Sequence, residues 1–154
     1  MARPQFSIAH KDDELIDLAG TCDQTTLARW AIDCAERVMP YFEDARPQDR
    51  RPQQAIDALQ NWIDTGEFRM AAIRKASLDA HAAARDVGED SPARAAARAA
   101  GQAVATAHVP RHAYGSAVYA QQAVFRATGS IDAAARERDW QYQHLLSLRD
   151  ENAS

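Results

Sequence analysis

The sequence predicts an all-α protein, a single-domain bundle of about seven helices over residues 1–154. Apolar residues recur at helical spacing through most of the chain, and no stretch alternates polar and apolar residues as a strand would. Residues 93–125 are also dominated by alanine, the best helix former, and small faces let helices pack closely. We expect the core at about 12–128 and a C-terminal helix at about 131–151.

In the first half, apolar stripes at helical spacing predict three helices, over about 12–21, 25–41 and 52–65. Acidic residues begin the first helix, where the helix dipole favours them, and Pro40 distorts or ends the last turn of the second. The polar segment 43–51 is expected to be a loop, and Pro52 then suits the first turn of the third helix. Trp30 and Trp62 lie on apolar stripes, so both are expected to be largely buried.

In the second half, four further helices are predicted, over about 67–86, 92–107, 111–128 and 131–151. Phe68 begins the apolar stripe of the first of these, which is expected to face the core. Ser91 caps the next helix, which carries Arg94 and Arg98 one turn apart on its outer face. Pro110 interrupts the alanine-rich stretch, so that this stretch forms two tightly packed helices with a joint between them.

Composition restricts the class of protein. The net charge of −4 and a pI near 5.7 argue against a nucleic-acid-binding surface, which normally shows a basic excess. The N-terminus has no apolar signal segment, and no apolar run is long enough to span a bilayer, so we expect a cytoplasmic protein without membrane association. Cys22 and Cys34 do not have metal-ligand spacing and are expected to be reduced thiols.

The joint between the two alanine-rich helices holds His108 and His112, which are the best metal-ligand candidates in the chain. Two histidines four residues apart on a helix can reach one zinc ion. The motif lacks the glutamate of H-E-x-x-H proteases, however, and Pro110 interrupts the helix between the histidines. We therefore expect no metal, and predict that both rings orient the joint and help to shape a polar cleft near His81.

No pattern of catalytic residues is found. Cys34 lies on an apolar stripe, where a thiol is usually an inert hydrophobe, and Ser116 is not part of a G-x-S-x-G elbow. No close acidic pair is predicted on an inner face, and neither a G-x-G-x-x-G nor a Walker sequence occurs. The sequence therefore predicts no cofactor and no enzymatic activity.

Polar side chains embedded in apolar helical context are the candidate binding residues. They are Asp33, Arg37, Arg51, His81, His108, His112 and Tyr119. One interpretation is structural: the arginines tie a loop to the second helix through Asp33 or Asp49 and hold the bundle together. The other is functional: the set lines a cleft that binds a partner or ligand.

Several motifs then occur in an order that resembles one protein family. They are LARWAIDCAER at 27–37, DRRPQQAI at 49–56, AHAAAR at 80–85 and AAGQAVATAHV at 99–109, followed by His112-Ala113 and Tyr119-Ala120. Together they resemble the Imm-5-like family of immunity proteins, which are all-α proteins of bacterial polymorphic-toxin systems. The resemblance covers about 15–125, and the segment after Gly129 lies outside it. It implies a non-catalytic protein that binds and neutralises a cognate protein toxin, and it transfers no catalytic residue.

Two alternatives of other classes remain open. One is a small-molecule- or metal-binding helical protein that uses the joint of His108 and His112. The other is a structural homo-oligomer, such as a homodimer, in which an alanine-rich face packs against its copy. For the toxin-binding interpretation, the net negative charge is compatible with electrostatic steering toward a basic toxin.

Overall fold

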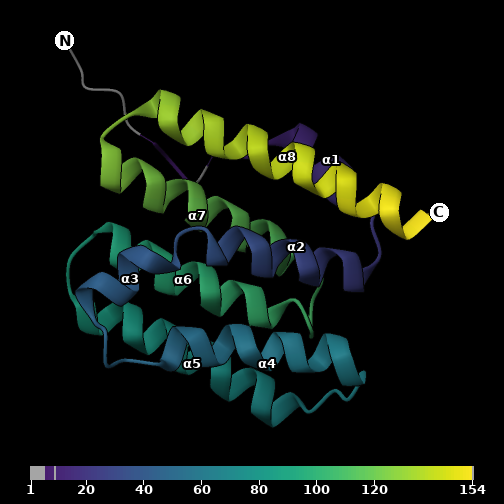
Figure 1. Cartoon of the computed structure of the whole chain (residues 1–154), viewed down its shortest axis with the longest axis horizontal. Coiled ribbons are helices and arrows are strands. Elements are labelled where there is room, and N and C mark those ends of the chain that lie inside the picture. Colours follow the sequence, from purple (N-terminus) through teal and green to yellow (C-terminus); the bar gives the residue numbers. More distant parts are fainter. Residues whose placement is uncertain (1–5, 9, 154) are drawn as a thin grey trace.

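The computed structural model describes residues 6–8 and 10–153, and in this part of the chain it contains eight helices and no strand (Figure 1). The all-α prediction is therefore confirmed, with one helix more than expected. The helices are α1 (Asp13–Ala19), α2 (Gln24–Glu36), α3 (Met39–Ala45), α4 (Arg51–Thr65), α5 (Met70–Val87), α6 (Pro92–Ala105), α7 (His112–Thr128) and α8 (Ile131–Ala153). None of these helices is both long and apolar enough to cross a membrane.

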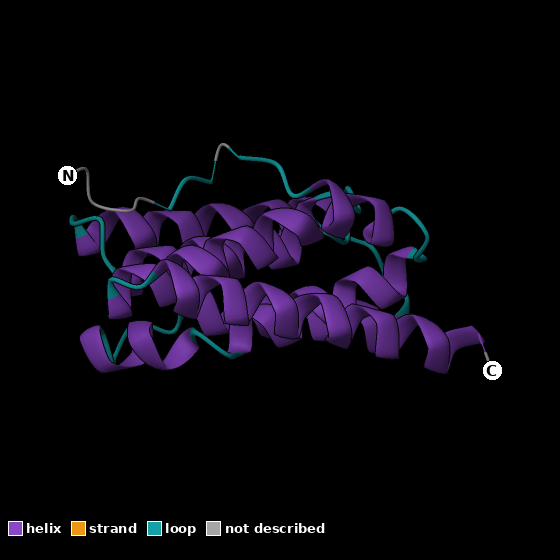
Figure 2. Ribbon diagram, turned by 90° about the horizontal axis from the view of Figure 1, so that it is seen from above, coloured by secondary structure: helices purple, strands orange, loops and turns teal. Residues whose placement is uncertain are grey.

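Helix α6 lies at the centre of the fold. It is flanked by α5 on one side and α7 on the other, while α2, α3 and α4 pack against its inner side. Helix α8 packs on α7 and α2, and the short α1 lies beside α7 and α8 (Figure 1). Seen from above, the helices run side by side with loops at their ends (Figure 2). The outer side of the α5–α6–α7 layer is thus left without a covering helix.

Local signals in the sequence set most helix boundaries. The Ser91 hydroxyl accepts a hydrogen bond of 3.2 Å from the Arg94 amide and so caps α6, as predicted. Gly66 and Gly129 end α4 and α7 with φ of 70° and 66°, in the left-handed region where only glycine is unstrained. The expected stops and caps around these helices are confirmed.

The additional helix corrects the prediction for residues 25–51. Helix α2 ends at Glu36, and residues 39–45, expected to be a helix end and a loop, form α3. Pro40 causes the break, because its ring clashes with the carbonyl four residues earlier and it has no amide hydrogen to donate. The same residue is favourable in the first turn of a new helix, which is where it lies in α3.

The core is built from small side chains around α6, with a few large ones at its edges. Trp30 is completely buried, as predicted, and its indole nitrogen donates to the Gln141 carbonyl at 2.9 Å. Gln141 and Leu145 are also completely buried, so α8 contributes directly to the core. Trp62 packs against the edge of the core and is only partly exposed, which agrees with the prediction that it is largely buried.

Helix α5 departs from its predicted burial pattern. It begins at Met70 rather than at 67, and its Ile73 side chain is buried in the core. Phe68, Met70 and Leu78, however, are 44%, 37% and 59% exposed. Helix α5 lies at the edge of its layer and contacts only α4 and α6 extensively, so the rest of its surface has no neighbour to cover it. The expectation that Phe68 begins a buried stripe is therefore wrong.

Candidate functional site

Asp33 and Arg37 face α8 rather than one another. The Asp33 carboxylate lies 2.6 Å from Nε2 of His144, and Arg37 donates to both carboxylate oxygens of Glu137 at 2.7 and 2.9 Å. The Arg37 guanidinium also lies 3.8 Å from the centre of the Trp140 ring, which stacks on His144. The hydrogen bond that Arg37 donates to Glu137 raises the pKa of Arg37. This network attaches α8 to the C-terminal end of α2.

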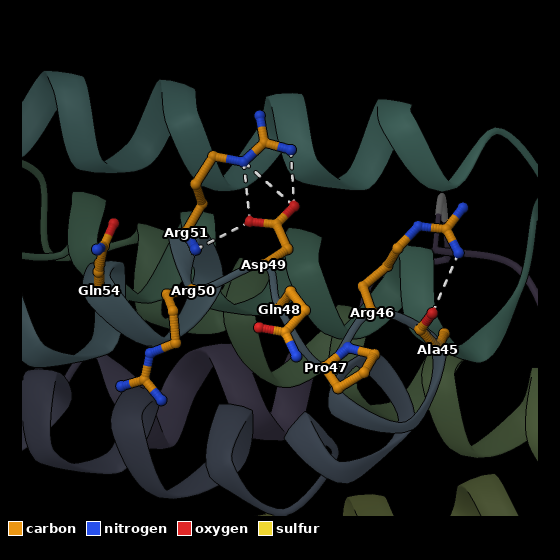
Figure 3. A pocket seen from close by; sticks show the side chains of 8 residues that line it. All are labelled: Ala45, Arg46, Pro47, Gln48, Asp49, Arg50, Arg51 and Gln54. Carbon is orange, nitrogen blue, oxygen red and sulfur yellow. Dashed lines mark hydrogen bonds and ion pairs between the residues drawn. The ribbon is translucent and has the colours of Figure 1, made fainter.

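Arg51 lies at the start of α4, where Ala45 to Arg51 and Gln54 line an open pocket of about 710 Å³ (Figure 3). Its guanidinium donates to Asp49 at 2.7 Å and to Asp86 of α5 at 2.6 Å. The hydrogen bond from Arg51 lowers the pKa of Asp49. The predicted tie to Asp49 is present, but the loop is bound to α5 and not to the second helix.

His81 lies on the outer side of the α5–α6–α7 layer and is held by Arg98. Nη1 of Arg98 is 2.9 Å from Nδ1 of His81. Since a guanidinium can only donate, Nδ1 is the acceptor, and the neutral ring carries its proton on Nε2. Burial, followed by the charges of Arg98 and Arg85, lowers the pKa of His81 to about 4. The ring is therefore neutral at physiological pH and keeps the arginine in place.

Two glycines make room for this arrangement. A Cβ added at Gly101 would lie 2.7 Å from Nε2 of His81, and a Cβ added at Gly115 would lie 2.7 Å from Oε1 of Gln102. Glycine inside a helix lowers helix stability by about 0.5–1 kcal/mol relative to alanine, so its presence here needs a packing reason. Here the reason is that a polar side chain of the neighbouring helix lies directly over each glycine.

His112 begins α7 and binds α6. Its Nδ1 lies 2.8 Å from Oε1 of Gln102, which is an acceptor, so Nδ1 carries the proton. Burial, followed by the charge of Arg111, lowers the pKa of His112. Tyr119 lies further along α7, close enough to Arg98 to affect its pKa. Three of the predicted residues, His81, His112 and Tyr119, thus gather along the outer side of α6.

His108 is placed apart from this group. Its ring stacks on Phe68 with centroids 6.0 Å apart, and it lines a small pocket of about 160 Å³ with Met70 and Leu78. The two histidines of the joint therefore have different partners, which disfavours a shared ligand. Within the described part of the chain, no group of three His, Cys, Asp or Glu side chains is arranged to hold a metal ion.

Two side chains considered as nucleophiles, Cys34 and Ser116, are buried. Cys34 is completely buried, and burial raises the pKa of its thiol. The Ser116 hydroxyl is also buried and donates to the Ala31 carbonyl at 3.2 Å. Cys22 is a free thiol like Cys34, and burial raises its pKa as well. A thiol with a raised pKa is a poor nucleophile at neutral pH.

Sequence reasoning did not identify Gln102 or Glu137 as partners of the predicted residues. Glu137 is 100 residues from Arg37 in the chain, and helical spacing gives the face of a side chain but not the helix opposite. For the outer side of α6 a usable signal was present, namely the two glycines in an otherwise helix-favouring, alanine-rich stretch.

Comparison with known proteins identifies the family. The family model described as Imm-5 like putative immunity protein matches residues 17–148. The match includes most of α8, so the expectation that the segment after Gly129 lies outside the resemblance is wrong. No curated protein and no solved structure matches the chain. The match covers most of the chain, which therefore belongs to the Imm-5 like family of putative immunity proteins.

Proposed function

We propose that this protein protects its host cell by binding a cognate protein toxin in the cytoplasm and neutralising it without catalysis. The observation that carries the proposal is the family match over residues 17–148. An immunity protein of this kind needs a stable scaffold and an accessible surface for the toxin. It does not need an active site, a cofactor or a metal.

The placement of polar side chains supports a binding protein over an enzyme. Charged groups on α2 and α8 are used in helix-to-helix contacts, as the bidentate pair of Arg37 and Glu137 illustrates. The buried Cys34 thiol and the Ser116 hydroxyl are closed to substrate. The side chains that remain accessible offer hydrogen bonds and apolar contacts, which suit recognition of another protein.

An accessible apolar surface is present on α5 and the loop before it. Phe68, Met70 and Leu78 are exposed; Met70 and Leu78 line the small pocket that also includes His108, and Phe68 stacks on the His108 ring. Large apolar side chains grouped on a surface are typical of protein interaction sites. This surface belongs to the same uncovered side of the fold as His81 and Arg98.

The proposal is tested by identifying a toxin domain in the gene upstream of this one and co-expressing it with this protein. We expect the protein to restore growth of a host that expresses this domain, and to co-elute with it as a complex of defined mass in size-exclusion chromatography with light scattering. Growth arrest that persists despite soluble protein, together with two separate elution peaks, would contradict the proposal. A homodimer that forms without the toxin and does not bind it would support the oligomer alternative instead.

A further inference from the structure

The outer side of the α5–α6–α7 layer carries a strip of arginines without carboxylate partners. Residues 92–131 contain no Asp or Glu, although the whole chain has a net charge of −4. Arg94 and Arg98 lie one turn apart on α6, and Arg85 in the last turn of α5 is close enough to affect the pKa of Arg98. We call these three residues the cationic strip. In the described part of the chain, no carboxylate lies within ion-pair distance of any of them.

Two of the acidic residues nearby in the sequence, Asp86 and Asp90, are paired with other arginines, while the exposed Glu89 forms no ion pair among the described residues. Asp86 binds Arg51 at 2.6 Å, and Asp90 binds Arg126 of α7 at 2.8 Å. These pairs neutralise charges at the end of the layer and leave the cationic strip uncompensated. The local field on this side of the protein is therefore positive, opposite to the net charge of the chain.

Arg98 has N–H donors that are not used within the described part of the chain and are available to an anion. It is partly buried, and its one side-chain hydrogen bond among the described residues goes to the neutral ring of His81. A guanidinium has five N–H donors, so most of them are left for another acceptor. Burial lowers the pKa of Arg98, and the like charges of Arg94 and Arg85 lower it further, while Tyr119 acts in the opposite direction.

Arg94 adds to this imbalance. It lies in the first turn of α6, where the helix dipole favours anions and disfavours cations. Both arginines are thus placed where the folded protein gains little from their charge, and an incoming anion would stabilise both. This placement indicates binding rather than a contribution to stability.

The surroundings of the strip favour a protein partner over a nucleic acid. Leu78, which is 59% exposed, lies on α5 one turn before His81, and Phe68 and Met70 are exposed beyond it. Arginine, aromatic residues and methionine are enriched in protein interfaces. Strong binding to a phosphate backbone needs many cations along an extended surface, which a strip of three arginines beside apolar side chains does not provide.

We propose that an acidic surface of the cognate toxin docks on the outer side of the α5–α6–α7 layer, with a carboxylate bound by Arg98 and apolar side chains covering Leu78 and Met70. This inference rests on the proposed function, since it names the chemistry of the toxin surface. A carboxylate matches the fork of the guanidinium and can accept two parallel hydrogen bonds. The positive strip, and not the net charge of −4, then determines which surface is recognised.

The test is isothermal titration calorimetry with the toxin domain encoded beside this gene. We expect Arg98→Gln to raise Kd at least about tenfold, as for loss of a charged interface hydrogen bond, and Arg94→Gln to raise it severalfold. Arg136→Gln is the matched control: it removes the same charge from an exposed position on α8, which packs on α7, α2 and α1. It should change Kd by less than about twofold.

Two further variants separate the contributions. Arg98→Lys keeps the charge but not the fork, so its affinity should fall between those of the wild type and Arg98→Gln. Leu78→Ser should weaken binding without altering its salt dependence. Raising NaCl from about 50 to about 500 mM should weaken binding of the wild type more than that of Arg98→Gln. Salt screens the ion pair between Arg98 and the toxin carboxylate, which the variant cannot form. Far-UV circular dichroism of each variant checks that it is folded.

The possible failures are distinguishable. If the wild type binds the toxin domain and Arg98→Gln binds it as tightly as Arg136→Gln, the docking surface is wrong and the proposed function stands. If the wild type does not bind the toxin domain, the proposed function fails and the inference fails with it. If Arg98→Gln instead abolishes binding of an RNA oligonucleotide or self-association of the protein, the surface serves another partner and the inference is overturned.

Discussion

Replacement of Gly101 by alanine tests whether the His81 ring is held against α6. Alanine at a helical glycine normally stabilises a protein by about 0.5–1 kcal/mol. Here the new Cβ would lie 2.7, 2.9 and 3.0 Å from three atoms of the His81 ring, so the ring must move. Its movement breaks the hydrogen bond of 2.9 Å with Arg98 and disturbs local packing.

The magnitude follows from these opposing effects. Loss of a hydrogen bond to a charged group costs about 1.5–3 kcal/mol, at the lower end for a partly exposed pair, and overpacking adds about 1 kcal/mol or more. After the gain in helix propensity is subtracted, Gly101→Ala should lower the free energy of unfolding by about 1–2 kcal/mol. In a His81→Ala background the obstacle is gone, and the same change should raise it by about 0.5–1 kcal/mol.

Urea unfolding followed by circular dichroism gives the free energy of unfolding of the four proteins in this double-mutant cycle, namely the wild type, the two single variants and the double variant, provided that their m-values are equal. Gly115→Ala is the control, because its Cβ meets Gln102 and not His81, and its effect should be the same in both backgrounds. Equal stabilisation by Gly101→Ala with and without His81 would refute the reasoning.

Three further predictions concern stability. Leucine at any one of the buried Ala100, Ala103 and Ala107 should lower the free energy of unfolding by about 1–3 kcal/mol through overpacking. Unchanged urea midpoints for all three variants would show that these helix faces are not in close contact with their neighbours. Arg37→Ala leaves the Glu137 carboxylate, which is 9% exposed, without its partner and should cost about 1–3 kcal/mol, moderated because Arg37 itself is 41% exposed. Arg29→Ala, at an exposed position on the same helix, should stay within about 0.5 kcal/mol, and equal effects of the two would contradict the assigned network. The pKa of His81 is about 4 in the folded protein against an ordinary value of 6.5, so the unfolded chain takes up the proton first and stability should fall as pH falls from about 6.5 to about 4. The contribution of His81 to this loss should be about 1–2 kcal/mol after allowance for solvent screening. His81→Gln should make the decline smaller by this amount but not abolish it, because the pKa of His112 is lowered as well; an equal decline in both proteins would assign it to other groups.

Helical periodicity predicted the fold class and most helix extents, because each amphipathic stripe is a local property of the chain. Pro40 shows where this reasoning was incomplete: the residue predicted a distorted helix end, but only the packing of residues 39–45 on α6 makes them a helix. Phe68 and Leu78 show another limit. An apolar stripe has the same pattern whether it faces the core or an uncovered side of the protein.

The candidate site was predicted only in part, for a similar reason. The sequence identifies His81, His112 and Tyr119 as polar residues in apolar helical context, and the structure brings them together along α6, His81 from α5 and the other two from α7. The sequence alone does not show that Arg37 pairs with Glu137, 100 residues away, or that the His108 ring stacks on Phe68. Those contacts depend on how α8 and the loop before α5 are placed, which local patterns do not determine.

The central claim, neutralisation by binding, is tested most directly by titrating the activity of the purified toxin domain with this protein. We predict that toxin activity falls linearly and reaches zero at one equivalent, without dependence on incubation time. A trace of protein that abolishes activity progressively with time would instead indicate turnover. That result would contradict the account and identify the protein as an enzyme.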